Sequence, residues 1–111
     1  MINRCAVTLT RKKPFQSWLE NLPDPEKVSL EELDEDSPVY LIPDYDMGKD
    51  RESFLELSHS AIFEVELHTW WTAEKDWPQN RTFEMFKQWF DYKFHSIVVD
   101  LVDEALHDDE M

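Results

Sequence analysis

The stretch from Thr82 to Ala105 (TFEMFKQWFDYKFHSIVVDLVDEA) constrains the fold of this chain more than any other. Its apolar residues recur at steps of three and four, a spacing that places side chains on one face of an α-helix. That face consists of Phe83, Phe86, Phe90, Phe94, Ile97, Val98, Leu101 and Ala105. Because the spacing stays in phase throughout, the sequence predicts one long amphipathic helix here. The residues at 95, 97, 99 and 101 also form an alternating set, so a strand stays an open alternative for Phe94–Val102.

A second stretch of helical periodicity runs from Glu52 to Trp71. Its main apolar stripe consists of Phe54, Leu57, Ser58, Ala61, Ile62 and Val65. The intervening loop, residues 72–81, contains a Trp-Pro pair and ends beside Thr82, which suits a helix N-cap. We therefore expect the two long helices to fold back on each other as an antiparallel hairpin.

Two short strands are predicted nearer the N-terminus. Ile2–Thr10 contains β-branched residues with a period of two, which places Cys5, Val7 and Leu9 on one side. Val39–Ile42 is a short apolar run bounded by prolines, which also suits a strand. The length of the connection does not decide whether the two strands pair in parallel or antiparallel.

Helical signals also occur between the two strands. Pro14 suits the first turn of a short helix that ends at Leu22, before two prolines. Ser29 and Glu32 have the spacing of a capping box, which would start one or two further turns. The expected fold class is therefore α+β, with two short β-strands and a short helix packed on a long antiparallel helical hairpin. We expect residues 1–111 to form a single small acidic domain.

Charge excludes some classes of ligand. The chain has 25 acidic and 11 basic residues, a formal net charge of −14 at pH 7. Direct binding to a phosphate backbone would be repelled, so we expect no nucleic-acid ligand. The acidic excess indicates one of two things. It is either a solvated surface or a surface that binds a basic protein partner, and such an acidic surface could imitate nucleic acid.

The compartment is inferred from three features. The apolar runs are too short to span a membrane, so we expect no membrane partner. The N-terminus lacks the continuous apolar segment of a secretory signal. The one cysteine, Cys5, cannot form an internal disulfide. Together these features favour the cytoplasm.

Each predicted long helix has a second, weaker apolar face. Phe63, Leu67 and Trp70 lie roughly opposite the main stripe of the first helix, and Trp89 and Tyr92 do so on the second. A small sheet covers little surface, so we predict that part of this second face is a homodimer interface. The predicted interface residues are Phe63, Trp70, Trp89 and Tyr92. The alternative is that the strands and the short helix cover both faces within one chain.

Several histidines follow a carboxylate by one helical turn, as His59 follows Glu56 and His95 follows Asp91. In a hairpin these four side chains could approach each other, and divalent metals accept imidazole and carboxylate together. Glu56, His59, Asp91 and His95 are therefore the candidate metal ligands. In so acidic a chain, however, a carboxylate near each histidine is expected by chance.

Motifs for catalysis are missing from the sequence. Its one glycine, Gly48, cannot supply a glycine-rich phosphate loop, and no serine lies in a nucleophile elbow. Cys5 lies on the apolar side of a predicted strand, where a structural thiol is expected. We therefore expect no catalytic residues and no cofactor, and predict a non-enzymatic protein-interaction or regulatory module that forms a homodimer. The two alternatives are a metal-binding helical hairpin that uses carboxylate and histidine pairs, and an acidic module that binds a basic protein.

Overall fold

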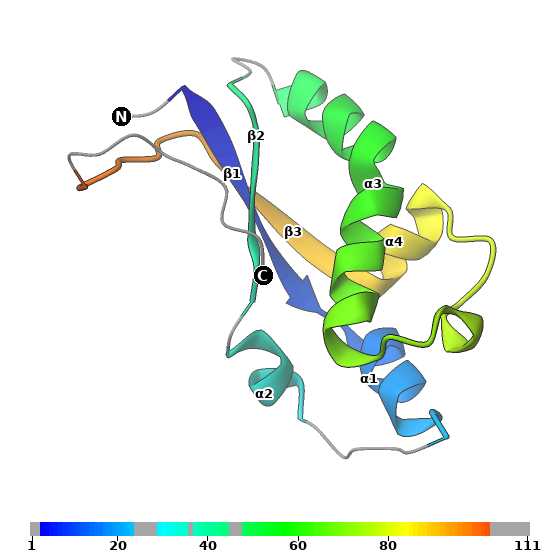
Figure 1. Ribbon diagram of the computed structural model, residues 1–111. Helices are drawn as coiled ribbons and strands as arrows, with labels where there is room; N and C mark the ends of the chain where they lie inside the picture. Colours follow the sequence, from blue (N-terminus) through cyan, green and yellow to red (C-terminus); the bar gives the residue numbers. More distant parts are fainter. Residues whose placement is uncertain (1–2, 24–28, 36, 45–47, 103–111) are drawn as a thin grey trace.

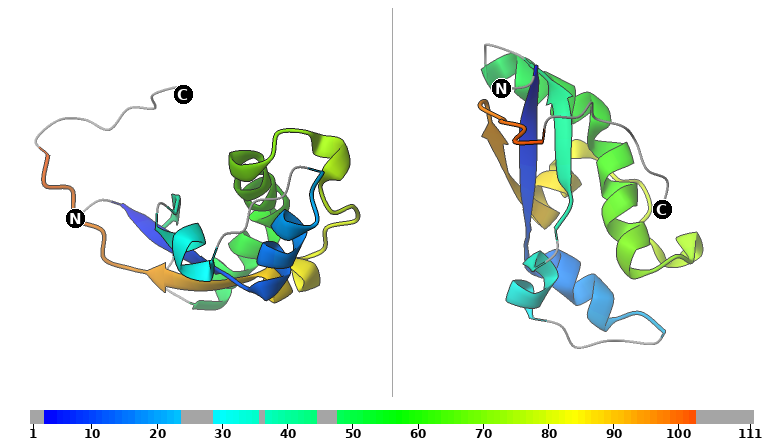
Figure 2. Two further views of the ribbon diagram at one scale, coloured as in Figure 1. Left: turned by 90° about the horizontal axis from the view of Figure 1, so that it is seen from below. Right: turned by 60° about the vertical axis from the view of Figure 1, so that its left-hand side comes forward.

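A three-stranded antiparallel sheet with helices on one of its faces forms this protein (Figures 1 and 2). The computed structural model of the 111-residue chain describes residues 3–23, 29–35, 37–44 and 48–102. The strand order is β2-β1-β3, so the first strand of the chain lies in the centre of the sheet. This combination of helices and an antiparallel sheet confirms the predicted α+β class.

The central strand β1 (Arg4–Arg11) pairs with both other strands. Its partners are β2 (Val39–Pro43) and β3 (Phe90–His95), and both run antiparallel to it. Both strands predicted from the sequence are confirmed, and the pairing direction that the sequence left open is antiparallel. The third strand was not predicted at this position.

The predicted long helix over Thr82–Ala105 is wrong. Helix α4 covers only Phe83–Trp89, and the backbone becomes extended at Phe90 and continues as β3. The pattern misled because Phe90 and Phe94, four residues apart, fit a period of two as well as a helical period. As a strand, this segment pairs with β1 over six residues, an interaction that a helix could not make. Residues 96–102 contain no helix or strand.

Helix α3 (Gly48–Trp70) confirms the other predicted long helix, but with a different face toward the core. Its buried residues are Leu55, Ile62, Phe63, Glu66 and Leu67. Leu57, which was predicted to lie in the main stripe, is 85% exposed. Apolar residues occur on both sides of this helix, so the sheet decides which side is buried. Since α4 is short, no long helical hairpin forms.

The shorter helices begin where the sequence predicts. Helix α1 (Lys13–Glu20) has Pro14 in its first turn and buries Phe15 and Leu19. Helix α2 (Leu30–Asp34) is capped by Ser29, whose hydroxyl oxygen accepts the Glu32 amide N–H at 3.1 Å. A short 3₁₀ helix, η1 (Glu74–Asp76), lies between α3 and α4. These elements are set by local capping and proline signals, which the sequence displays directly.

Aromatic side chains dominate the core between the sheet and the helices. Phe63 from α3 lies with its ring centroid 5.3 Å from Phe90 of β3 and 5.4 Å from Trp89 of α4. Phe15 of α1 completes the cluster, 5.6 Å from Phe90. All four are almost fully buried, so the core joins elements from both ends of the chain.

Candidate functional site

One face of the sheet is partly open within the described part of the chain, where Arg4 and Thr10 of β1 are exposed but Ala6 is only 7% exposed. Alternate residues of a strand point to opposite faces, so the neighbours of the buried residues of β1 point away from the helices. On β2, Val39 is 60% exposed and Leu41 is 48% exposed. We call this side the outer face, and it comprises Arg4, Ala6, Thr8, Thr10, Val39, Leu41, Pro43, Asp91, Lys93 and His95.

The outer face changes in character from one edge to the other. The register places Leu41, Ala6 and His95 side by side across the three strands. The β2 edge is therefore apolar, the central strand carries small residues apart from Arg4 at its start, and the β3 edge carries charge. Counting Arg4, Lys93 and Asp91, with His95 neutral, the formal charge of this face is +1. A nearly balanced face on a chain of net charge −14 is unusual within this molecule.

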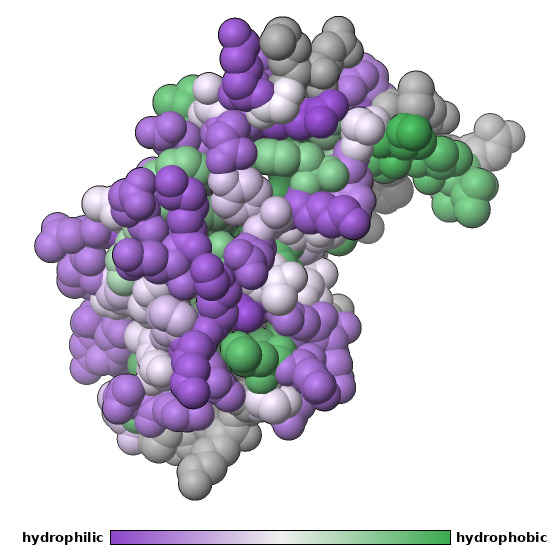
Figure 3. All heavy atoms as spheres, turned by 180° about the vertical axis from the view of Figure 1, so that it is seen from behind, coloured by the Kyte–Doolittle hydropathy of each residue, from purple (hydrophilic) through white to green (hydrophobic). Residues whose placement is uncertain are grey.

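Further apolar side chains are exposed just after β3. Ile97 is 72% exposed and Leu101 is 93% exposed. In the view from behind, this segment appears as a green projection at the upper right, opposite its place in Figure 1 (Figure 3). Exposed apolar groups are thus concentrated on β2 and after β3.

The other face of the sheet contains a buried ion pair. Arg11, the last residue of β1, binds the Glu66 carboxylate of α3, and their side chains are 2% and 1% exposed. The second oxygen of Glu66 accepts the Tyr40 hydroxyl proton at 2.5 Å. Arg11 also donates to Asp34 at 3.3 Å and to Ser37 at 2.8 Å. The network therefore connects β1, β2, α3 and the end of α2.

Burial raises the pKa of Tyr40 to about 12, and the nearby Arg11 guanidinium opposes that shift. The hydroxyl therefore stays protonated and donates to Glu66 at neutral pH. Since Arg11 and Glu66 are closed off from solvent, this network cannot meet a substrate directly, and its role is to position α2 beside α3. The sequence reasoning missed it, although Arg11 continues the alternation of Cys5, Val7 and Leu9.

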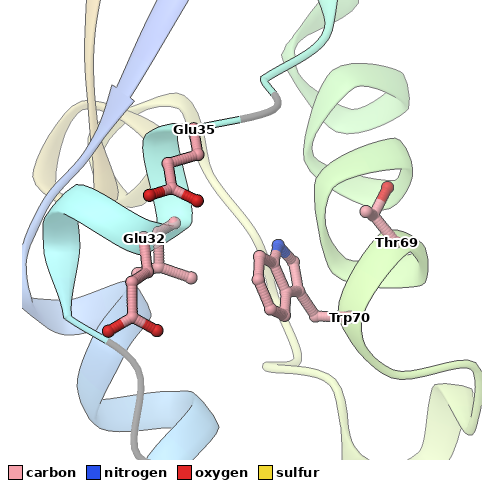
Figure 4. A pocket seen from close by; sticks show the side chains of 5 residues that line it. Glu32, Glu35, Thr69 and Trp70 are labelled. Carbon is pink, nitrogen blue, oxygen red and sulfur yellow. The ribbon is translucent and has the colours of Figure 1, made fainter.

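A pocket of about 260 Å³ lies between α2 and the end of α3. Its lining residues are Glu32, Leu33, Glu35, Thr69 and Trp70. Figure 4 shows the Trp70 indole projecting from α3 into the gap, with Glu32 of α2 and Glu35, the residue that follows α2, on the opposite side. We call this site the Trp70 pocket. It combines an aromatic surface with two carboxylates.

The opposite flank of α3 has a shallower hollow that includes Glu64, His68 and Trp77. Arg81 contacts two of these lining residues, Glu64 and Trp77. Its guanidinium pairs with Glu64 at 2.9 Å and lies over the Trp77 ring, 5.8 Å from the ring centroid. We call this arrangement the Arg81 site. A tryptophan and a carboxylate thus hold a cation from the same chain.

The candidate metal ligands are engaged separately. His59 lies on α3 against Phe83 and Phe86, and its Nδ1 is 2.5 Å from the carbonyl oxygen of Glu56. His95 ends β3 and bonds Thr8 at 3.0 Å, and Asp91 lies 3.7 Å from Lys12. No group of three or more histidine, cysteine, aspartate or glutamate side chains in the described residues is arranged to hold a metal ion.

The four predicted interface residues do not form one exposed surface. Phe63 and Trp89 are buried in the core, 0% and 9% exposed. Tyr92 is half-buried and its hydroxyl binds Glu52, which together with burial raises the pKa of Tyr92. Trp70 alone lines an open pocket. The surplus apolar face of the predicted helices is thus largely used to cover the sheet.

Comparison with protein-family models, with curated proteins and with solved structures found no match to this chain. None of the described helices is both long enough and apolar enough to cross a bilayer. The outer face, the buried network and the Trp70 pocket are therefore the candidate functional features of the described residues.

Proposed function

We propose that this chain is a non-enzymatic protein-interaction module that forms a homodimer through its outer face. One observation carries the proposal: the sheet exposes a partly apolar, nearly charge-balanced face on an otherwise strongly acidic chain. Apolar patches on a surface are typical of interaction sites. The charge distribution favours a second copy of the chain as the partner that binds this face.

Electrostatic repulsion favours this face for self-association. Two copies of net charge −14 repel each other, so their contact is least costly where the local charge is least negative. The outer face has that property. In a twofold contact the same patch meets itself, so Lys93 of one copy can approach Asp91 of the second. That pairing adds attraction where the rest of the surface repels.

The apolar edge of the outer face supplies the second contribution. Val39 and Leu41 are exposed on β2, and β2 is an edge strand of the three-stranded sheet. Edge strands present unpaired backbone groups together with side chains that a partner can cover. Fully burying a leucine side chain stabilises a complex by about 1.5–3 kcal/mol, and Leu41, which is 48% exposed, can gain about half of that. Leu41 is therefore the residue on which the dimer should depend most.

Other features support a binding role in a reducing compartment. The buried charges of Arg11 and Glu66 are paired with each other, which suits a structural task. Cys5 is a free thiol that is 0% exposed, as is common for structural cysteines. A free thiol fits the cytoplasm, which we propose as the compartment.

Sedimentation equilibrium over a range of protein concentrations tests the dimer. We expect a monomer–dimer equilibrium whose dissociation constant increases about 10-fold or more in Leu41→Lys, because a charge then replaces a covered leucine. The added lysine makes the chain less acidic, so weaker association cannot come from greater net repulsion. The matched control is Leu57→Lys, since Leu57 is 85% exposed on α3 outside the outer face. A monomeric wild-type chain, or equal effects of both variants, would contradict the proposal.

A further inference from the structure

We infer that the Trp70 pocket receives an arginine side chain from a basic protein partner. This inference goes beyond dimerisation and does not depend on it. The site lies on the helical side of the molecule, between α2 and α3, and the outer face lies on the other side of the sheet (Figures 2 and 4). A dimer held through the outer face would leave this pocket accessible.

The lining of the pocket matches a guanidinium group. The indole of Trp70 offers an electron-rich ring, and a cation placed over such a ring is attracted to it. Glu32 of α2 and Glu35, directly after α2, lie across the gap from the ring. A planar guanidinium can stack on the indole and donate to a carboxylate from its edge, whereas the compact ammonium group of lysine has no plane that can stack. The pocket volume of about 260 Å³ is sufficient for one such side chain.

The carboxylates of the pocket are available for a ligand. Among the described residues, neither Glu32 nor Glu35 forms an ion pair, and Glu32 accepts only the Ser29 hydroxyl, at 3.2 Å. Asp34, which lies between them in sequence, already binds Arg11. Arg11, the nearest buried cation, therefore pairs with Asp34 and does not neutralise the charges of Glu32 and Glu35.

The Arg81 site shows that this chemistry is used in the same molecule. On the other flank of α3, a tryptophan and a glutamate hold the Arg81 guanidinium by stacking and by an ion pair. The Trp70 pocket has the same two kinds of group and one more carboxylate. The difference is that its cation has to come from another molecule. Charge complementarity with a chain of net charge −14 favours a basic partner.

The buried network holds both walls of the pocket in place. Glu66 lies one turn before Trp70 on α3, and Asp34 lies beside Glu35 on α2. Because Arg11 binds both Glu66 and Asp34, the two walls are tied to the same residue of β1. A site held in its binding geometry loses less entropy when a ligand binds. The ion pair thus supports recognition without contacting the ligand.

The test is an NMR titration that follows the indole N–H signals of the five tryptophans. The probe is N-acetyl-arginine methylamide, added at constant ionic strength, and the Trp70 signal is assigned with Trp70→Phe. We expect the Trp70 signal to move and to saturate, and the other four to stay nearly unchanged. In Glu32→Gln/Glu35→Gln the dissociation constant should increase about fivefold, because two exposed charge contacts are lost.

The matched control is Asp50→Asn/Glu56→Gln, which changes the net charge equally. Glu56 lies 14 residues before Trp70 on the same helix, roughly 20 Å away. We expect this control to bind the probe within about twofold of the wild type, since distant exposed charges are screened. Equal weakening in both double variants would mean diffuse attraction and would overturn the inference, as would a Trp70 signal that does not move.

Two further measurements separate the possible causes. Far-ultraviolet circular dichroism shows whether each variant is folded. A variant that is unfolded is excluded, because its loss of binding would not report on the pocket. The titration is then repeated with Leu41→Lys. Unchanged binding in that variant shows that the pocket acts independently of the dimer. Binding that disappears together with dimerisation would contradict the independence claimed here.

Discussion

The two faces of the sheet differ in what they do with polar groups. The inner face buries Arg11 and Glu66 almost completely and pairs them with each other, with Tyr40 and with Ser37, although Nε of Arg11 has no hydrogen-bond partner among the described residues. The outer face leaves its charges in solvent and exposes Leu41 beside them. Burial makes each inner polar group expensive to remove, whereas exposure makes the outer groups nearly irrelevant to folding. The inner face therefore determines stability, and the outer face is free to serve association.

The largest effect should follow removal of the buried carboxylate. Glu66→Ala leaves the Arg11 guanidinium buried without its partner, which should lower the free energy of unfolding by about 3–5 kcal/mol. Chemical denaturation measures this change. Glu64→Ala is the matched control, because Glu64 is 52% exposed and pairs with Arg81 at the surface, and it should cost about 1 kcal/mol at most. Equal costs for the two variants would remove the distinction between buried and exposed charge.

A smaller loss is expected for Tyr40→Phe. The substitution removes only the hydroxyl that donates to Glu66 at 2.5 Å. A hydrogen bond to a charged group contributes about 1.5–3 kcal/mol, so the unfolding free energy should fall by about that amount. Denaturation of the wild type, of Tyr40→Phe, of Glu66→Ala and of the double variant Tyr40→Phe/Glu66→Ala completes a double-mutant cycle. Strictly additive costs would show that the two groups do not interact.

The same tyrosine should make stability depend on alkaline pH. Its pKa is about 12 in the folded chain against 10.0 for the free side chain. A raised pKa means that this contribution is complete below pH 10 and is lost as the pH increases from 10 to 12. Tyr92 adds to the slope, because burial and Glu52 also raise its pKa. Stability measured from pH 8 to 12 should therefore fall less steeply, but still fall, in Tyr40→Phe. An unchanged slope would contradict this assignment.

The smallest effect on folding should come from the outer face. Leu41→Ala, studied at concentrations where the chain is monomeric, should change the unfolding free energy by about 0.5 kcal/mol or less. The same variant should weaken the dimer, because the part of the leucine side chain that is exposed in the monomer, 48%, would be covered there. A loss of 2 kcal/mol or more in the monomer would mean that Leu41 is buried within its own chain. The comparison between the faces would then fail.

Local signals account for the parts of the fold that the sequence predicted. β1, α1 and α2 each have their own marker: the alternation of Cys5, Val7 and Leu9, the proline at position 14, and the Ser29 cap. These features act over a few residues. They can therefore be recognised without knowing what packs against them.

The errors concern residues whose environment is set far along the chain. Phe90 and Phe94 fit both a helix and a strand, and pairing with β1 decides in favour of the strand. The buried side of α3 is likewise set by the sheet, which is why Phe63 faces the core and Leu57 faces solvent. The Arg11–Glu66 pair spans 55 positions. Its sequence signals are local: Arg11 continues the alternation of Cys5, Val7 and Leu9, and Glu66 follows Ile62 and Phe63 at helical spacing.

The Trp70 pocket itself was not predicted from the sequence. The acidic composition left a basic partner as one of two alternatives, and Trp70 was predicted as a homodimer-interface residue, which stays a prediction. The pocket itself depends on how α2 lies beside α3, and that arrangement follows from the bonds of Arg11 to Asp34 and Glu66. The spacing of residues within one helix does not show that α2 and α3 are both bound to Arg11 of β1.

The central claim is that two copies meet through the outer face, and isotope-filtered NMR tests it most directly. An equimolar mixture of ¹³C-labelled and unlabelled chains shows nuclear Overhauser effects only between copies. We expect such contacts at the methyl groups of Val39 and Leu41. Intermolecular contacts at Leu57 and none on β2 would contradict the claim. So would a chain that sediments as a dimer but shows no intermolecular contacts at Val39 and Leu41.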